Sequence, residues 1–210
     1  PAVFTPDALL IQAGWLQSGL TNNVLLNDAN RGITLNGTWS VNPQAASSIT
    51  IVCPIVGAGE IWKRGPGVLA LAGDNSGHFG GVRLGAFSAG SQVNVNSTTA
   101  LGTGPLIIPN DGNQPTLDNE SGSALTTAGN NNQNWNRSFT FLGSSSLNLG
   151  SGLVTLGNNV AVTVSNNTLT VGAVVEDGLI RSLTKQGPGT LVINGGASHL
   201  GNTVVNEGVL

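Results

Sequence analysis

One glycine-proline motif occurs twice in this chain, at a constant offset of 122 residues (185 − 63 and 195 − 73). Lys63–Gly73 reads KRGPGVLALAG, and Lys185–Gly195 reads KQGPGTLVING. Each copy is a turn that opens onto a short alternating strand and closes on another glycine. A chain that repeats itself in this way is usually a stack of similar modules. We therefore expect structural turns at Gly65, Pro66, Gly67, Gly73, Gly187, Pro188, Gly189 and Gly195.

The composition indicates a folded, weakly charged β-protein. Of 210 residues, 39% are hydrophobic and only 8% are charged, and 31 are glycine. Disordered chains combine low hydrophobicity with high charge, so this chain is not of that class. A surface with so few charges must be solvated by Asn, Ser, Thr, Gly and exposed backbone, which is common in secreted proteins. We therefore expect an extracellular location.

Several classes of partner are excluded on the same grounds. The net charge is −3 and the seven basic residues are scattered, so no basic stripe could neutralise a row of phosphates in a nucleic acid. No apolar run approaches the length of a membrane span. Cys53 is the only cysteine, which rules out a disulfide within the chain and favours a small buried side chain.

Short alternating runs such as Val160–Val164 recur about every seven to ten residues, separated by Gly, Asn, Ser and Asp. Two architectures fit this rhythm: an antiparallel β-sandwich or barrel, and a parallel β-solenoid. Hairpin sandwiches favour longer strands and two-residue turns. Very short strands, broad glycine-rich turns and tandem recurrence favour the all-β solenoid. We expect about 20–25 residues per coil and roughly nine coils, with a strand through Leu9–Ile11.

The residues from Leu183 to Leu210 resemble the autotransporter-associated β-strand repeat, a passenger-associated β-helix repeat of bacterial surface proteins. The match runs through Gly187-Pro188-Gly189 to Asn206-Glu207-Gly208. Weaker matches occur at 31–35, 100–106, 134–141 and 147–152. The resemblance implies a right-handed parallel β-helix exported to the cell surface, with no catalytic residues and no cofactor. The tyrosine usual in the family is replaced by the His78-Phe79 pair in the first copy of the motif.

We interpret residues 1–210 as one elongated solenoid segment with two related units, approximately 1–88 and 89–210. The chain starts at Pro1 and stops at Leu210, within what resembles a repeat. This indicates a piece of a longer repeat protein. Because unpaired strand edges seek partners, we expect end-to-end self-association or continuation into further repeats.

Few residues have side chains that could act as acids, bases or metal ligands, and we assign none of them a catalytic, metal-binding or cofactor-binding role. Asp118 and Glu120 form a close acidic pair that we interpret as part of a solvated loop. Glu176 and Asp177 precede a glycine and indicate a turn. His78 and His199 occupy equivalent positions too many coils apart to share a metal ion. The sequence therefore predicts a protein that is not an enzyme.

Tryptophan offers the best candidate for ligand contact. Trp62 stands beside Lys63 and Arg64, so it could stack against a sugar of a surface glycan. The other three tryptophans are expected to cover coil ends or corners. The leading hypothesis is an extracellular structural or adhesive module, part of a cell-surface stalk or filament. The alternatives are a carbohydrate-binding or carbohydrate-degrading β-helix, and a segment of a viral fibre or spike.

Overall fold

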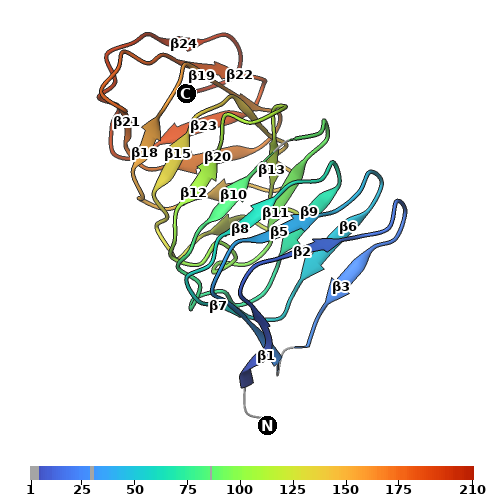
Figure 1. Ribbon diagram of the computed structural model, residues 1–210. Coiled ribbons are helices and arrows are strands. Elements are labelled where there is room, and N and C mark those ends of the chain that lie inside the picture. The colour runs from blue at the N-terminus through green and yellow to red at the C-terminus, as the bar shows by residue number, and fades with distance from the viewer. Residues whose placement is uncertain (1–4, 29–30, 86) are drawn as a thin grey trace.

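The computed structural model describes residues 5–28, 31–85 and 87–210, which form a stack of short β-coils and no helix. Figure 1 shows the chain winding upward from the blue N-terminal coil to the red C-terminal one. All strand pairings among the described residues are parallel. The predicted all-β parallel solenoid is confirmed, and the alternative of an antiparallel sandwich is wrong.

Each coil crosses up to three faces. Face 1 is the eight-stranded sheet, made of β2 (Gly14–Gln17), β5 (Trp39–Asn42), β8 (Ile61–Lys63), β10 (Val82–Leu84), β12 (Leu106–Ile108), β15 (Gln133–Trp135), β18 (Val154–Leu156) and β21 (Val174–Glu176). Face 2 is the nine-stranded sheet, made of β3 (Val24–Leu26), β6 (Ser48–Ile51), β9 (Val68–Leu71), β11 (Gln92–Val95), β13 (Thr116–Asp118), β16 (Phe139–Phe141), β19 (Val160–Val164), β22 (Leu183–Gln186) and β24 (Thr203–Val205).

Face 3 is built from two smaller sheets, and each of their strands after β1 follows a face 2 strand in chain order. The first contains β1 (Thr5–Ile11), β4 (Arg31–Leu35) and β7 (Ile55–Val56). The second contains β14 (Leu125–Thr126), β17 (Leu147–Asn148), β20 (Thr168–Val171) and β23 (Thr190–Ile193). The expected strand through Leu9–Ile11 is therefore present, as the end of β1.

Two coils cross face 3 between these sheets without forming a strand, at residues 74–78 and 98–102. The buried side chain of Asn75 joins them to their neighbours. Its Oδ1 accepts a hydrogen bond from the Ile55 amide at 2.9 Å, and its Nδ2 donates to the Ala100 carbonyl at 2.8 Å. An asparagine amide has the donor and acceptor of a peptide group, so it can take the place of the missing ladder bonds.

The coil length varies between the coils. Paired residues are 20 positions apart at Val154 and Val174, and 27 apart at Leu106 and Gln133. The expected 20–25 residues per coil is therefore close to what the structure has. The differences are absorbed by the turns, because the strands themselves stay in register.

A single column of apolar side chains fills the interior. The strands of face 2 place aliphatic and aromatic residues directly above one another, all fully or almost fully buried: Ile49, Leu69, Val93, Leu117, Phe141 and Val164. Trp135 and Phe139 add an edge-to-face pair with ring centroids 5.0 Å apart. Cys53 is buried beside this core, as expected.

The two copies of the glycine-proline motif occupy different corners of the solenoid. In the first copy the motif joins β8 on face 1 to β9 on face 2. In the second it joins β22 on face 2 to β23 on face 3. The repeat in sequence is thus shifted by one face relative to the coils. Faces 1 and 2 continue without a break past residue 88, and the division into two units stays a prediction.

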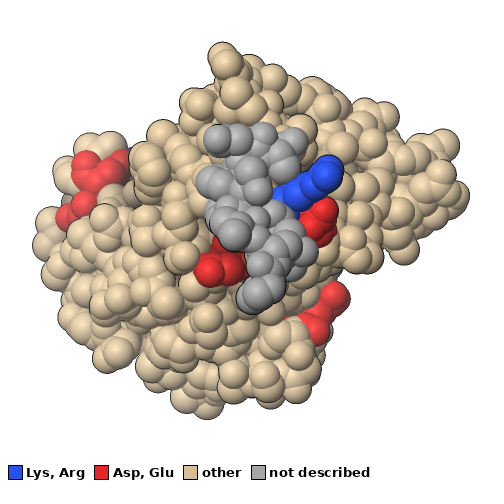
Figure 2. Space-filling view, turned by 90° about the horizontal axis from the view of Figure 1, so that it is seen from below, with Lys and Arg blue, Asp and Glu red and all other residues tan. Residues whose placement is uncertain are grey.

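The exterior carries few charges. Figure 2 shows the N-terminal end from below, with only scattered acidic and basic side chains on a mostly uncharged surface. Within the described residues there is no helix with the length and hydropathy of a membrane span.

Candidate functional site

One outward-facing row of side chains runs along face 1, one residue from each coil. The strand register places these residues next to each other in the order Trp15, Ser40, Trp62, Arg83, Ile107, Asn134, Thr155 and Val175. Successive coils are about 4.8 Å apart. Two indole rings are therefore separated by a single small serine, and this end of the row forms an aromatic surface.

Arg64, the residue after β8, lies over this surface. Its guanidinium carbon is 4.4 Å from the ring centroid of Trp62, 4.3 Å from that of Phe87 and 5.3 Å from that of Trp15. Trp62 and Phe87 also contact each other, with centroids 5.7 Å apart. A guanidinium within about 6 Å of an aromatic ring is attracted to the ring face. We call these four residues, Trp15, Trp62, Arg64 and Phe87, the Arg64 cluster.

The cluster is open to solvent on its outer side. Trp15 is 57% exposed and Phe87 is 43% exposed, while Trp62 and Arg64 are half-buried. Ser40 points outward in the same row but is only 8% exposed, because it lies between two indoles. The result is an aromatic platform that is partly open to solvent.

The two arginines of this region differ in how their charges are balanced. Arg83 forms a bidentate ion pair with Glu60, with Nη2–Oε1 at 3.0 Å and Nε–Oε2 at 3.1 Å. The Arg64 guanidinium has no ion pair and no hydrogen bond to any residue in the described ranges. The cluster therefore presents one positive charge that aromatic rings hold in place and that no carboxylate neutralises.

The motif glycines lie at corners, where successive coils approach closely. A Cβ added to Gly65 would be 2.1 Å from the carbonyl oxygen of Pro43 in the preceding coil, so no larger residue fits there. Gly187, at the second corner, has a φ of 77°, in the left-handed region that favours glycine. The other predicted turn residues lie in the same two corners or at the ends of the strands that follow: Pro66, Gly67, Gly73, Pro188, Gly189 and Gly195.

Two lysines that the sequence analysis did not single out stabilise both corners. Lys63 is fully buried, and its Nζ donates to the Gly65 carbonyl and to Ser91 Oγ at 2.8 Å in the next coil. Lys185 is also buried, and its Nζ donates to Gly187 O at 2.7 Å and to Glu207 O at 3.1 Å in the next coil.

Each lysine thus binds the carbonyl two residues ahead of it and a group one coil further on. The signal was present in the sequence, because both copies of the motif begin with lysine. Burial lowers the pKa of Lys63 to about 7. Burial also lowers the pKa of Lys185, against the opposing charge of Glu207. Among the described residues, no carboxylate is a hydrogen-bond partner of either ammonium, so both charges are stabilised mainly by carbonyl and hydroxyl oxygens.

The interpretation of Asp118 as a loop residue is wrong. Asp118 ends β13 and is fully buried. Its carboxylate accepts hydrogen bonds from the Asn119 amide at 2.9 Å, from the Ser144 amide at 2.9 Å and from Ser144 Oγ at 2.6 Å. Three donors hold the carboxylate as a link between two coils, so it is not free to act on a substrate. Its neighbour Glu120 is exposed and accepts a hydrogen bond from Asn94 at 2.5 Å.

The remaining polar candidates are also used in turns. Asp177 pairs with Arg181, four residues on, which fits the expected turn. His78 is buried, with Nε2 2.8 Å from the Gly59 carbonyl, and burial lowers its pKa. His199 is partly buried, and its Nε2 lies 2.9 Å from Thr203 Oγ1. Among the described residues, no group of three or more His, Cys, Asp or Glu side chains could hold a metal ion.

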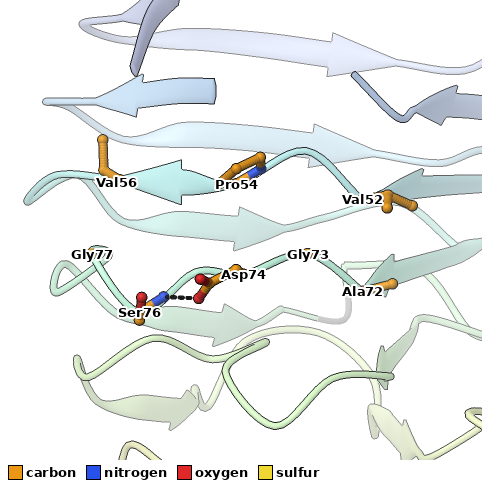
Figure 3. Close-up of a pocket in the computed structure, with 8 residues that line it drawn as sticks. All are labelled: Val52, Pro54, Val56, Ala72, Gly73, Asp74, Ser76 and Gly77. Carbon is orange, nitrogen blue, oxygen red and sulfur yellow. Dashed lines mark hydrogen bonds between the residues drawn. The ribbon is translucent and has the colours of Figure 1, made fainter. Parts of the chain in front are cut away.

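A groove of about 480 Å³ lies on face 3, where the strand β7 has no strand partner in the following coil. Figure 3 shows its lining residues projecting from two successive coils: Val52, Pro54, Val56, Ala72, Gly73, Asp74, Ser76 and Gly77. Asp74 is the only charged residue in the lining, and its Oδ1 accepts a hydrogen bond from the Ser76 amide at 3.1 Å. That bond lowers the pKa of Asp74. The groove offers no second acid or base.

Comparison with known proteins agrees with the coil geometry. The passenger-associated-transport-repeat family matches residues 183–210, which contain β22, β23 and β24. The resemblance noted from the sequence is thereby confirmed for this part of the chain.

Over 98% of its length, the chain is also 32% identical to part of a Brucella suis protein described as an adhesin autotransporter, BmaC. The chain spans about 5% of the length of that relative. No solved structure matches the chain.

Proposed function

We propose that the chain is an extracellular, adhesive passenger segment that forms part of a cell-surface stalk and has no catalytic role. The observation that supports this most directly is the unbroken parallel stack that ends in a passenger-associated-transport repeat. Similarity to part of an autotransporter adhesin points the same way. In a stack of this kind each coil satisfies the backbone hydrogen bonds of the next, so length is gained additively and the result is a stiff spacer.

The two ends of the stack support continuation or end-to-end association. At the C-terminal end, all three residues of β24 are exposed, and Val205 is 48% exposed although its register partner one coil earlier, Lys185, is fully buried. At the N-terminal end, Leu9 is 46% exposed although its register partner in the next coil, Ile33, is 2% exposed. Residues at interior positions of the stack, such as Ile49, are fully buried. A further coil, or a second copy of the chain, would cover these side chains and pair the open strand edges.

Association can be tested on the purified chain by light scattering over a range of concentrations, with electron microscopy of the same samples. We expect oligomers that lengthen with concentration. Val205→Glu places a charge at an inward-facing position of the open C-terminal coil and should shift the protein toward the monomer. Ile107→Glu, on the outer side of face 1, is the matched control. Monomers at every concentration would contradict end-to-end association.

Adhesion can be tested separately by coating beads with the chain and measuring their retention on cultured host cells. Beads coated with an unrelated β-solenoid of similar length serve as the control for non-specific adsorption. We expect specific retention of the coated beads. Equal retention of both kinds of bead would refute the adhesive role, and it would leave the spacer role to the association experiment.

A further inference from the structure

We infer that the Arg64 cluster binds a carboxylated sugar residue, of the uronic or sialic acid type, in a surface glycan. This names the ligand of the proposed adhesive surface and rests on that proposed function. Trp62 was expected to contact a sugar from its place beside Arg64 in the sequence. The structure adds the exposed rings of Trp15 and Phe87, and the unpaired charge between them.

The charge indicates an anionic ligand. Of the two arginines next to Trp62, Arg83 is neutralised by Glu60 at 3.0 Å, and Arg64 is not neutralised by any described residue. A guanidinium presents a planar fork of donors that matches the two oxygens of a carboxylate. Because Arg64 is already held over three rings, little side-chain freedom would be lost when it binds.

The rings indicate that the group carrying the carboxylate has a flat apolar side. Trp15 and Phe87 stay 57% and 43% exposed beside the guanidinium. The C–H face of a pyranose could lie on such a ring while its carboxylate reaches Arg64. The strands β2, β5, β8 and β10 that carry this row lie side by side on one face (Figure 1).

The shape and the charge favour a glycan over other anions. The platform is partly open to solvent, and the row continues along face 1 with the polar residues Asn134 and Thr155, so an extended chain could lie along it. A nucleic acid would need a row of cations, and the chain as a whole has a net charge of −3. An acidic peptide would engage the guanidinium but has no pyranose face for the rings.

The test is direct binding of the purified chain, by calorimetry, to sialyllactose and to a hyaluronan oligosaccharide. Carboxyl-reduced hyaluronan and a glutamate peptide of equal charge are the comparison ligands. We expect one or both acidic sugars to bind, with affinity about tenfold or more above both comparison ligands. Which of the two binds distinguishes a sialic acid from a uronic acid.

The variants Arg64→Gln and Trp15→Ala should each weaken binding about tenfold or more, because one removes the charge and the other a ring. Arg137→Gln removes one positive charge next to β15, further along face 1, and Phe79→Ala removes an exposed ring outside the cluster. Both controls should bind as the unchanged protein does. Circular dichroism and thermal unfolding establish that each variant is folded.

Three results would overturn the inference: no binding of either acidic sugar, equal binding of the comparison ligands, or equal loss in the controls and in Arg64→Gln. The bead assay distinguishes failure of the sugar-binding inference from failure of the proposed adhesive function. If beads adhere and Arg64→Gln beads adhere equally well, the ligand is wrong and adhesion stands. If the sugar binds through Arg64 but beads do not adhere, the binding site stands and the adhesive role is wrong.

Discussion

Because its ammonium is buried, Lys63 makes the free energy of unfolding of this solenoid rise with pH in the alkaline range. Burial lowers the pKa of Lys63 from the ordinary 10.5 to about 7. Between these two values the unfolded chain binds a proton that the folded chain has released. The free energy of unfolding therefore rises with pH across this window, and the Lys63 contribution is least favourable below about pH 7.

The magnitude follows from the size of the shift. One pKa unit corresponds to about 1.4 kcal/mol, so the contribution of Lys63 should change by about 3 kcal/mol between about pH 7 and about pH 9.5. The variant Lys63→Met keeps a similar length and removes the titration. It also leaves the Gly65 carbonyl and Ser91 without their donor, at a cost of about 1–3 kcal/mol. We expect Lys63→Met to be less stable than the unchanged protein near pH 9.5 and similar to it or more stable near pH 7.

The measurement is equilibrium unfolding in guanidinium chloride at constant salt, followed by tryptophan fluorescence, for both proteins at several pH values. The difference between the two curves removes the other groups that titrate. These include Cys53, whose raised pKa makes stability fall as pH rises above 9.0, and Lys185, whose lowered pKa acts in the same direction as Lys63. If the two proteins keep a constant difference across the range, Lys63 is not the titrating group and the argument fails.

Three further changes test the packing of the coils by the same unfolding measurement. Gly65→Ala should lose about 1–3 kcal/mol because its Cβ would be 2.1 Å from the Pro43 carbonyl oxygen, whereas Gly14→Ala, with ordinary contacts, should lose almost nothing; similar losses would refute the close-approach argument. Leu117→Ala, in the middle of the apolar column, should lose about 2–5 kcal/mol, and a loss below about 1 kcal/mol would mean that the column is loosely packed. Asp118→Ala should lose about 1–3 kcal/mol or more because it leaves buried donors without an acceptor, and a neutral effect would restore the solvated-loop interpretation.

The candidate site shows how far the sequence could lead. The sequence alone places Trp62 near Arg64, because the two are only two residues apart, and the role of Trp62 in ligand contact stays a prediction. Trp15 and Phe87 could not be assigned to the same surface, since their positions depend on the lengths of the intervening coils, which vary. The loop interpretation of Asp118 was wrong for the same reason, because its donors at Ser144 come from the next coil.

The sequence by itself determined the parallel coils, their approximate length and the corners. Alternating aliphatic residues and glycine-proline turns are local features, and each acts within a few residues. Only the tertiary structure decided which corner each copy of the motif occupies. In each copy the lysine donates a hydrogen bond to the carbonyl two residues ahead, so the turn is closed by a local contact. The eleven-residue motif can therefore join faces 1 and 2 in the first copy and faces 2 and 3 in the second. That choice depends on the summed length of all the coils between them.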